Sequence, residues 1–241
     1  MESILAVDNV TVAYGPMQIL NSLSFEVNRG EVLGIIGPNG AGKTTLLNAL
    51  CGLARVQSGS LRYQGSEISR FSPAKRCRMG IGRTYQVPRP FENMTVMENV
   101  MVGGVHGAGL SEKHARDKSL EILSVTGLVD KKRILAGKLT LLDRKRLEVA
   151  RALATNPQVL LLDEVAAGLT EAEVRTVMEL VAETQKMGVT IVWIEHIIMT
   201  MLEATTRLMC LAAGKNLLCG QPQEVMNSKV VEEVYLGVEE V

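Results

Sequence analysis

The sequence predicts an α/β fold with a parallel-sheet core. Three apolar runs of strand length, at residues 31–36, 159–164 and 189–194, each end at a glycine or at polar residues. Between the last two, apolar residues of 171–186 recur at the i, i+3, i+4, i+7 spacing of an amphipathic helix. Alternation of strand, helix and strand implies parallel strands, and the carboxyl ends of such strands form the ligand site.

The beginning of the chain adds a second kind of sheet to this core. Residues 3–27 alternate short apolar stretches with turn residues, which predicts a small antiparallel sheet that leads into the run at 31–36. A turn is expected at 58–60 and a short strand at 61–63, and residues 80–86 return to strand character. The chain is therefore expected to begin as a β-rich region.

Residues 91–157 show a helical pattern without a long strand. Helices are expected at 115–124, where Gly127 marks the end, and at 144–154. We interpret this region as a helical lobe inserted between two strands of the parallel sheet.

Composition and charge exclude several classes of protein. Of the 241 residues, 46% are hydrophobic, which is enough for a core, and 26 basic residues balance 26 acidic ones, so no net field attracts nucleic acid. Residues 1–3 lack the basic region of a signal peptide, and no stretch of about 18 uncharged apolar residues predicts a transmembrane helix. Metal-site spacing is absent among the cysteines, which favours free thiols in a reducing cytoplasm at Cys51, Cys77, Cys210 and Cys219.

One loop carries the strongest functional pattern in the chain. It fits G-x-x-x-x-G-K-[ST], follows the strand run at 31–36 and precedes an apolar helix opening at 46–50. Glycines let successive backbone N–H groups face one concavity, where they bind phosphate oxygens. Lys43 is expected to reach the β- and γ-phosphates, and Thr44 to hold Mg²⁺. The sequence thus predicts a nucleoside triphosphate site formed by Gly37, Pro38, Asn39, Gly40, Ala41, Gly42, Lys43, Thr44 and Thr45.

Polar residues follow the two later strand runs, at the sheet edge where this loop must also lie. Asp163 ends an apolar strand, so its burial favours a cation as partner, and Mg²⁺ fits. Glu164 is a candidate to orient or deprotonate an attacking water, although carboxylates also occur at helix N-termini. His196 is either structural or a γ-phosphate contact, and its position favours the second. Tyr14 is either an ordinary strand residue or a platform for a purine base.

In order and spacing, these motifs resemble the ATP-binding subunits of ABC transporters over essentially the whole chain. The resemblance implies that Tyr14 stacks on adenine, that residues 37–45 form the Walker A loop and that residues 159–163 form Walker B. Residues 167–169 resemble the D-loop, and Gln86 the Q-loop glutamine that couples to the membrane domains. The functional residues implied in this way are Glu164, His196 and Gln86 for catalysis of ATP hydrolysis and Thr44, Gln86 and Asp163 for Mg²⁺.

The resemblance also implies the architecture in more detail. It is that of an ABC-type P-loop NTPase, with a parallel-sheet core, an N-terminal antiparallel β-subdomain and an inserted helical subdomain. Within a single ATPase domain over residues 1–241, the nucleotide-binding core would comprise residues 1–86 and 158–241, and the helical subdomain residues 87–157.

Several shorter stretches resemble the branched-chain amino-acid importer ATPases within that family. They lie at residues 82–86, 91–96, 136–137, 146–148, 194–196 and 234–237. The ATPases of urea, amide and lipopolysaccharide transporters share several of these stretches, so another transporter remains an alternative.

One motif departs from the family pattern. Where the family carries L-S-G-G-Q or L-S-Y-G-Q, this chain has Leu139, Thr140, Leu141, Leu142 and Asp143. Thr140 keeps a hydroxyl, whereas Leu142 replaces the glycine that permits close backbone approach. Asp143 adds a carboxylate near a helix N-terminus meant for the γ-phosphate on the opposite subunit, where like charges are expected to weaken the contact. This departure predicts a heterodimer with one strong and one weak ATP site, or a homodimer with slow turnover.

The expected function is that of an ATP-hydrolysing subunit that energises a membrane transporter, for branched-chain amino acids or related small polar solutes. Its partners would be a second ABC ATPase subunit, integral membrane permease subunits and an extracytoplasmic solute-binding protein, with no nucleic acid. The chain would be cytoplasmic, peripheral on the inner face of the cell membrane. An alternative of another class is a nucleotide-binding regulatory subunit with little catalysis, which the altered signature at residues 139–143 suggests.

Overall fold

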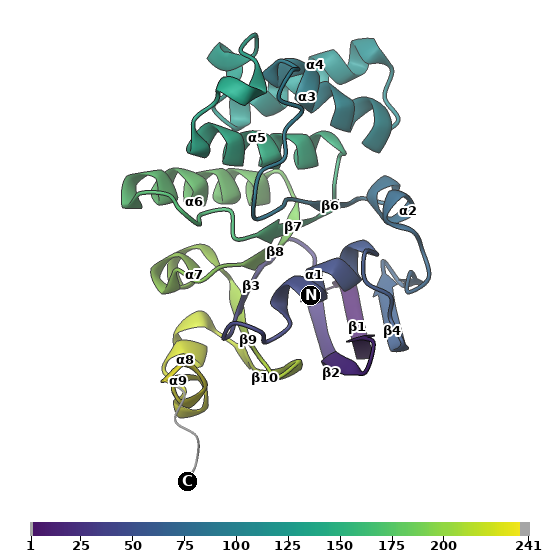
Figure 1. Cartoon of the computed structure of the whole chain (residues 1–241), viewed down its shortest axis with the longest axis vertical. Helices are drawn as coiled ribbons and strands as arrows, with labels where there is room; N and C mark the ends of the chain where they lie inside the picture. The colour runs from purple at the N-terminus through teal and green to yellow at the C-terminus, as the bar shows by residue number, and fades with distance from the viewer. Residues whose placement is uncertain (1, 237–241) are drawn as a thin grey trace. The chain divides into compact units, whose positions relative to one another are not determined.

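The computed structural model describes residues 2–236, and the chain divides into two compact units (Figure 1). The first unit comprises Met1–Pro73 and Thr190–Val241, and the second comprises Ala74–Val189. Gly237, which closes one of the importer-like stretches, lies outside the described residues. The domain boundaries expected at residues 86/87 and 157/158 stay a prediction.

An antiparallel sheet occupies the start of the first unit, as expected. β1 (Ser3–Tyr14) pairs with β2 (Met17–Asn28) and β4 (Ser58–Tyr63), and β4 pairs with β5 (Ser66–Glu67), in the order β2-β1-β4-β5. The turn predicted at 58–60 is wrong, because these residues open β4. At Gly59, where φ is +83°, a Cβ atom would lie 2.3 Å from the carbonyl oxygen of Asn9. Glycine therefore lets the two strands approach where their register shifts.

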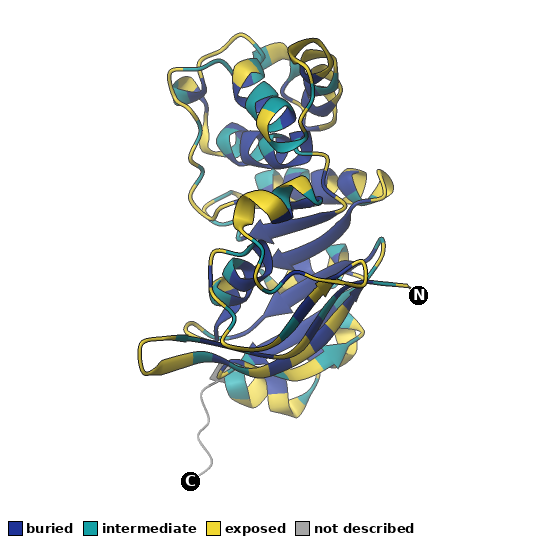
Figure 2. Cartoon of the chain, turned by 90° about the vertical axis from the view of Figure 1, so that its right-hand side faces the viewer, coloured by how far each residue is buried: buried dark blue, intermediate teal, exposed yellow. Residues whose placement is uncertain are grey.

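Four further strands of the first unit lie in the order β10-β9-β3-β8. β3 (Val32–Ile36) is parallel to β8 (Thr190–Ile194) and to β9 (Arg207–Ala212), and β10 (Lys215–Gly220) returns antiparallel to β9. Every residue of β3 and β8 is buried, as is typical of parallel strands (Figure 2). The helices of this unit are α1 (Lys43–Cys51), α7 (Ile198–Ala204), α8 (Pro222–Met226) and α9 (Lys229–Leu236).

The second unit contains two parallel strands and most of the helices. β6 (Ile81–Arg83) pairs with the fully buried β7 (Val159–Asp163). β6 is shorter than the strand character of residues 80–86 indicated, because the ladder ends once the N–H of Thr84 has bonded to the Leu161 carbonyl (2.9 Å). The helices are α2 (Pro73–Arg78), α3 (Val96–Val102), the π-helix η1 (Gly103–Gly107), α4 (Glu112–Val125), the 3₁₀ turns η2 (Val129–Lys131) and η3 (Ala136–Lys138), α5 (Leu141–Ala154) and α6 (Glu171–Lys186).

Capping side chains set where the predicted helices begin. α6 has its predicted bounds, since Thr170 and Glu173 form a capping box at its start. α5 begins three residues earlier than expected, because the Thr140 hydroxyl accepts the N–H of Asp143. α4 likewise starts at Glu112, after the N-cap Ser111. The predicted fold class, a parallel core with an antiparallel β-region and a helical region, is confirmed.

None of the helices within residues 2–236 combines the length and the apolar character that a membrane crossing requires.

The cysteines are free thiols, as expected, and burial raises the pKa of both Cys210 and Cys219. Because the thiolate is the reactive form, a raised pKa makes these two side chains poor nucleophiles.

The capping box of α6 provides a stability test. The Thr170 hydroxyl accepts the N–H of Glu173, and the Glu173 carboxylate accepts the N–H of Thr170 at 2.9 Å. We expect Thr170→Ala to lower the free energy of unfolding by about 1 kcal/mol, measured by urea denaturation. Thr176→Ala, in the interior of the same helix, is the control and should not be destabilising, because alanine is favoured there. Equal losses in the two variants would contradict the capping argument.

The same pair makes the loss in Thr170→Ala depend on pH. Hydrogen bonds from Thr170 lower the pKa of the Glu173 carboxyl. A lowered pKa in the folded state contributes stability that is present above the ordinary pKa of glutamate and is lost as pH falls through the lowered value. We therefore expect the difference between wild type and Thr170→Ala to shrink in acid. A difference that stays constant from neutral to acidic pH would contradict this.

Candidate functional site

The loop between β3 and α1 requires glycine at two positions. At Gly37, where φ is +151°, a Cβ atom would lie 2.0 Å from the carbonyl oxygen of Leu211. At Gly42, where φ is +103°, it would lie 2.9 Å from Leu20 Cδ2 and 3.1 Å from the carbonyl oxygen of Ile19. The loop can therefore fold tightly only with glycine at both positions.

Lys43 folds back over this loop. Its side chain is buried, and Nζ donates hydrogen bonds to the carbonyl oxygens of Gly37 (2.6 Å) and Pro38 (2.9 Å). α1 begins at Lys43, and its N-cap Gly42 provides no side-chain hydrogen bond to the first turn. The positive end of the helix dipole and a lysine thus share one loop, an arrangement that suits phosphate. The remaining loop residues differ in exposure: Asn39, Gly40 and Thr44 are exposed, Thr45 is half-buried and Ala41 is buried.

His196 lies at the same edge of the sheet within the first unit. β3 and β8 are parallel and Ile35 is opposite Ile194, so the segments that follow the two strands leave the sheet on the same side. His196 is exposed, and its backbone N–H donates to the carboxylate of the buried Glu195 at 3.2 Å. The structure therefore brings the phosphate loop and His196 to one sheet edge.

Tyr14 ends β1, opposite Met17 across a short turn. The two side chains belong to the most exposed large hydrophobic residues, at 53% and 66% exposure. An uncovered aromatic ring at a turn fits a stacking platform for a purine base, and this role of Tyr14 stays a prediction.

In the second unit, Asp163 ends the buried strand β7 and pairs with Arg83. The Nη2 atom of Arg83 donates to Oδ2 of Asp163 at 3.0 Å, and both side chains are buried, with 7% and 4% of their surface exposed. Oδ1 of Asp163 is buried and has no hydrogen-bond partner among residues 2–236. Burial raises the pKa of Asp163, and the Arg83 guanidinium partly offsets that rise.

Glu164 follows Asp163 in a left-handed backbone conformation, with φ of +47°, which is uncommon for a residue other than glycine. Its Oε2 atom accepts a hydrogen bond of 2.5 Å from Nε2 of Gln86. Glu164 is half-buried and Gln86 is exposed. The structure thus brings together two of the three residues that the sequence suggested for catalysis.

A buried lysine of α5 fixes the backbone beside both residues. Nζ of Lys145 donates to the carbonyl oxygen of Gln86 at 2.7 Å and to that of Glu164 at 2.9 Å. Further along α5, Nη1 of Arg151 donates to the carbonyl oxygen of Arg89 at 2.7 Å. The loop after β6 is therefore attached to α5 at two points.

The residues predicted to hold Mg²⁺ are divided between the units, with Thr44 in the first and Gln86 and Asp163 in the second. Within residues 2–236, no group of three or more histidine, cysteine or acidic side chains forms a metal cluster. Mg²⁺ rarely needs one, because it usually binds one or two carboxylates together with substrate phosphates and water. The buried, unpartnered Oδ1 of Asp163 is an oxygen that suits this ion, so Asp163 fits Mg²⁺ brought by a triphosphate.

The signature region forms the N-terminus of α5. The Thr140 hydroxyl accepts the N–H of Asp143 (3.3 Å) and donates to Oδ2 of the same residue (3.0 Å). Leu139 is buried, Leu141 is 44% exposed and Leu142 is half-buried. Leu142 is not among the residues with positive φ, so glycine at this position is not required by the backbone conformation. Its side chain nevertheless adds bulk at the helix end.

The like-charge repulsion expected from Asp143 is wrong for this structure. The Asp143 side chain is buried, is paired with Lys131, and its Oδ1 lies 3.6 Å from Nη1 of Arg146. The carboxylate is thus neutralised by two cations and is hidden from solvent. The exchange of glycine for Leu142 remains the departure that can affect a contact across a dimer.

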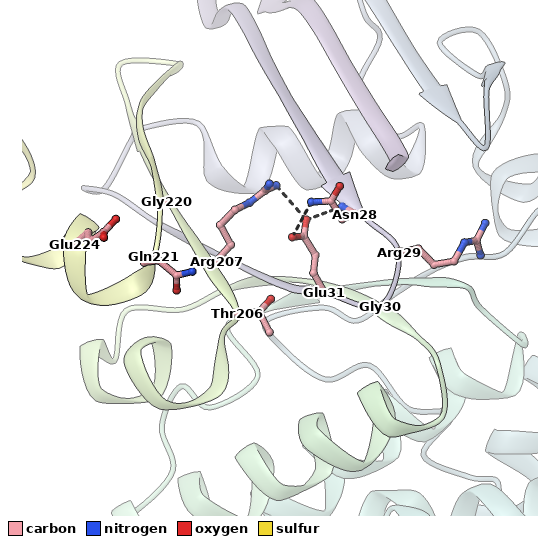
Figure 3. Close-up of a pocket in the computed structure, with 9 residues that line it drawn as sticks. All are labelled: Asn28, Arg29, Gly30, Glu31, Thr206, Arg207, Gly220, Gln221 and Glu224. Carbon is pink, nitrogen blue, oxygen red and sulfur yellow. Dashed lines mark hydrogen bonds and ion pairs between the residues drawn. The ribbon is translucent and has the colours of Figure 1, made fainter. Parts of the chain in front are cut away.

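A separate cavity of about 570 Å³ lies elsewhere in the first unit (Figure 3). It adjoins the amino ends of β3 and β9, whereas the phosphate loop follows the carboxyl end of β3. Glu31 and Arg207 in this cavity bond to each other at 3.0 Å, so these two charges are already paired. None of the predicted site residues lines this cavity. Its lining residues are Asn28, Arg29, Gly30, Glu31, Thr206, Arg207, Gly220, Gln221 and Glu224.

Arg83 and Lys145 are the contacts of this site that sequence reasoning missed. Arg83 offered a signal, because a cation on a strand that neighbours an acid-ended parallel strand can reach the acid. Lys145 offered none, since its partners are backbone carbonyls whose positions only the fold defines.

The bonds of Lys145 can be tested by their removal. We expect Lys145→Met to lower the free energy of unfolding by about 2 kcal/mol, since it removes charge-assisted hydrogen bonds to two carbonyl groups. Lys138→Met, at an exposed position just before α5, is the control and should change stability by less than about 0.5 kcal/mol. Chemical denaturation followed by circular dichroism measures both. An unchanged denaturation midpoint for Lys145→Met would contradict the proposal that these hydrogen bonds stabilise the fold.

Known proteins are similar in sequence to this chain over 98% of its length. This chain is 33% identical over 235 residues to the lipopolysaccharide export system ATP-binding protein LptB of Haemophilus influenzae, and the alignment covers 98% of each chain. It is also 33% identical over 251 residues to the high-affinity branched-chain amino acid transport ATP-binding protein LivG of Salmonella typhimurium, again with 98% of each chain covered.

Solved structures give the same result for the fold. A nucleotide-free ATP-binding cassette from an ABC transporter superposes with a TM-score of 0.89 at 29% identity, over 99% of this chain and all of that one. The cbiO1 protein of Clostridium perfringens, part of the ABC transporter complex cbiONQ, gives 0.86 at 30% identity, over 99% and 96%. A family model described as ABC transporter matches residues 20–167. The chain therefore belongs to the ABC transporter family, as one of its ATP-binding subunits.

Proposed function

We propose that the chain binds and hydrolyses ATP to energise a membrane transporter. The observation that carries this proposal is the pair Asp163 and Glu164 at the end of a buried strand. One carboxylate keeps an oxygen for a cation, and the other contacts the side chain of Gln86. A phosphate-binding loop alone supports binding, and this pair adds the groups that hydrolysis needs.

The phosphate loop would bind the triphosphate through backbone N–H groups and through Lys43. In the structure, Nζ of Lys43 bonds to carbonyl oxygens of its own loop, so it is held close to the place where phosphates would lie. These donors would stabilise the charge that develops on the γ-phosphoryl oxygens in the transition state. His196, at the same sheet edge, is the second group that we assign to this task.

Glu164 would polarise the attacking water. Its Oε2 atom accepts a hydrogen bond from Nε2 of Gln86, which orients the carboxylate, and a carboxylate has about four acceptor sites, so the same group can also accept from a water. We infer that Gln86 acts as the orienting partner of Glu164. Because the family couples the corresponding glutamine to the membrane domains, a movement of Gln86 would alter the orientation of this carboxylate.

Thr44, Gln86 and Asp163 are the residues that would hold Mg²⁺. When bound, this ion would neutralise charge on the β- and γ-phosphates.

The altered signature, residues 139–143, supports a heterodimer with one strong and one weak ATP site, or a homodimer with slow turnover. The reason differs from the one that the sequence suggested. The Asp143 charge is neutralised by Lys131 and Arg146, so the obstacle is the side chain of Leu142 at the end of α5. A leucine there keeps a partner's phosphate further from the helix N–H groups than a glycine would.

The transported solute is proposed as a branched-chain amino acid or a related small polar solute. The similarity to LivG proteins and the importer-like stretches support import, while the similarity to LptB favours lipopolysaccharide export as the alternative. The partners would be permease subunits, a second ATPase subunit and an extracytoplasmic solute-binding protein. The chain would then be cytoplasmic and peripheral on the inner face of the membrane.

A second candidate is a nucleotide-binding regulatory subunit with little catalysis, and Leu142 in the signature favours it. The two candidates differ in whether Glu164 performs chemistry. Single-turnover hydrolysis, with the protein in excess over ATP, distinguishes them.

We expect Glu164→Gln to lower the single-turnover rate by roughly 10²-fold or more, with ATP affinity unchanged, because only the carboxylate can act as the base. The exposed Glu179→Gln on α6 is the control and should hydrolyse like wild type. If wild type and Glu164→Gln release phosphate equally slowly, the regulatory candidate replaces the enzyme.

The altered signature predicts opposite results for two neighbouring variants. Leu142→Gly should raise the hydrolysis rate of the purified chain, by up to about 10²-fold if one donor to the γ-phosphate is restored. Asp143→Gln should not raise it, and should lower stability because it leaves Lys131 and Arg146 without their carboxylate. Leu120→Gly on α4 controls for glycine in a helix. Brisk, cooperative hydrolysis by the unmodified chain alone would contradict the weak-site proposal.

A further inference from the structure

Arg83 has a role that the proposed function does not use. We propose that Arg83 is a positioning residue that holds Oδ2 of Asp163, so that Oδ1 stays available to the metal ion that accompanies ATP. This inference rests on the proposed function, because it concerns that ion. It concerns a contact within the second unit.

The contact is specific to one oxygen of the carboxylate. Nη2 of Arg83 donates to Oδ2 at 3.0 Å, whereas Oδ1 is buried and has no hydrogen-bond partner in the described part of the chain. A guanidinium that bonded both oxygens in a fork would compete with a metal ion for the carboxylate. Contact with a single oxygen instead fixes the rotation of the carboxyl group and leaves one oxygen for a ligand.

The surroundings of Arg83 prevent it from following the carboxylate freely. Its guanidinium lies over the ring of Tyr85, 5.1 Å from the centroid, and its side chain is 7% exposed. Arg83 is also paired with Leu161 in the parallel ladder. A side chain held by packing and stacking is suited to orient a neighbour, because its own position is determined.

Thr84 locks the two strand ends in register beside this pair. Its N–H donates to the carbonyl oxygen of Leu161 at 2.9 Å, and its hydroxyl accepts the N–H of Asp163 at 3.2 Å. The backbone of Asp163 is therefore fixed by Thr84 and its side chain by Arg83. Removal of a group that fixes a metal-binding carboxylate in this way commonly lowers metal affinity by about 10- to 100-fold.

The identity of the cation also fits a positioning role. An arginine presents a planar group that can stack on Tyr85 and donate in one direction, whereas a lysine ammonium has no plane to fix. The other cation close to Asp163, Lys145, donates to the carbonyl oxygens of Gln86 and Glu164. Orientation of the Asp163 carboxylate therefore falls to Arg83.

The test is a Mg²⁺ titration of ATP binding. A fluorescent ATP analogue is bound to wild type and to Arg83→Met, and the Mg²⁺ concentration at half-maximal signal is recorded. We expect this concentration to rise at least about 10-fold in Arg83→Met. Binding of the analogue in the presence of a chelator should be unchanged, because residues 37–45 are untouched. A merely structural role would alter thermal stability without moving the Mg²⁺ requirement.

Three further variants sharpen the test. Arg78→Met, at an exposed position of α2, is the matched control and should behave as wild type. Arg83→Lys keeps the charge without the planar group, so we expect its half-maximal Mg²⁺ concentration to lie between those of wild type and Arg83→Met. This variant replaces Arg83→Met in the test if Arg83→Met does not fold. In an Asp163→Asn background, Arg83→Met should add no further rise, because Arg83 acts through Asp163.

An unchanged or lower Mg²⁺ requirement in Arg83→Met and Arg83→Lys would overturn the inference, and so would a further rise in the Asp163→Asn background. Failure of the proposed hydrolysis is detected separately, by the single-turnover rates of wild type and Glu164→Gln, and failure of ATP binding itself would leave wild type unable to bind the analogue at any Mg²⁺ concentration.

Discussion

The constraint on which the site depends is the burial of a carboxylate at the end of an apolar strand. Asp163 closes β7, where every residue is buried, and an ionised side chain there is stable only with a cation beside it. Arg83 supplies that cation from the neighbouring strand and bonds one oxygen only. The second oxygen stays unpartnered among the described residues, which gives the strand end a capacity to bind a further cation.

α5 connects this strand end to the signature region. The helix begins after Thr140, whose hydroxyl accepts the N–H of Asp143, and further along the helix Lys145 and Arg151 hold the loop that carries Gln86. A shift of the helix would thus reach the backbone of both Gln86 and Glu164. In a dimer of the kind proposed, contacts at the signature of one subunit would in this way act on the residues that hydrolyse its own ATP.

Most of the fold could be predicted from the sequence, because local patterns determine it. The runs at 31–36, 159–164 and 189–194 and the helix at 171–186 follow from periodicity and caps alone. β9 and β10 could not be predicted in the same way, since the pairing of β9 with β3 is defined only by the fold and no residue of β10 is buried. The charge effect assigned to Asp143 failed for a related reason: Lys131, 12 residues earlier, neutralises it only in the folded chain. Motifs with backbone requirements were predictable, whereas contacts between side chains distant in sequence were not.

The central claim is that the loop around Lys43 binds ATP. Isothermal titration calorimetry of the purified chain with ATP and Mg²⁺ tests it most directly, with Lys43→Met as the comparison and the exposed Lys75→Met as the control. We expect saturable binding of one ATP per chain in wild type and in Lys75→Met, and loss of that binding in Lys43→Met. Absence of binding by wild type, or equal binding by Lys43→Met, would contradict it.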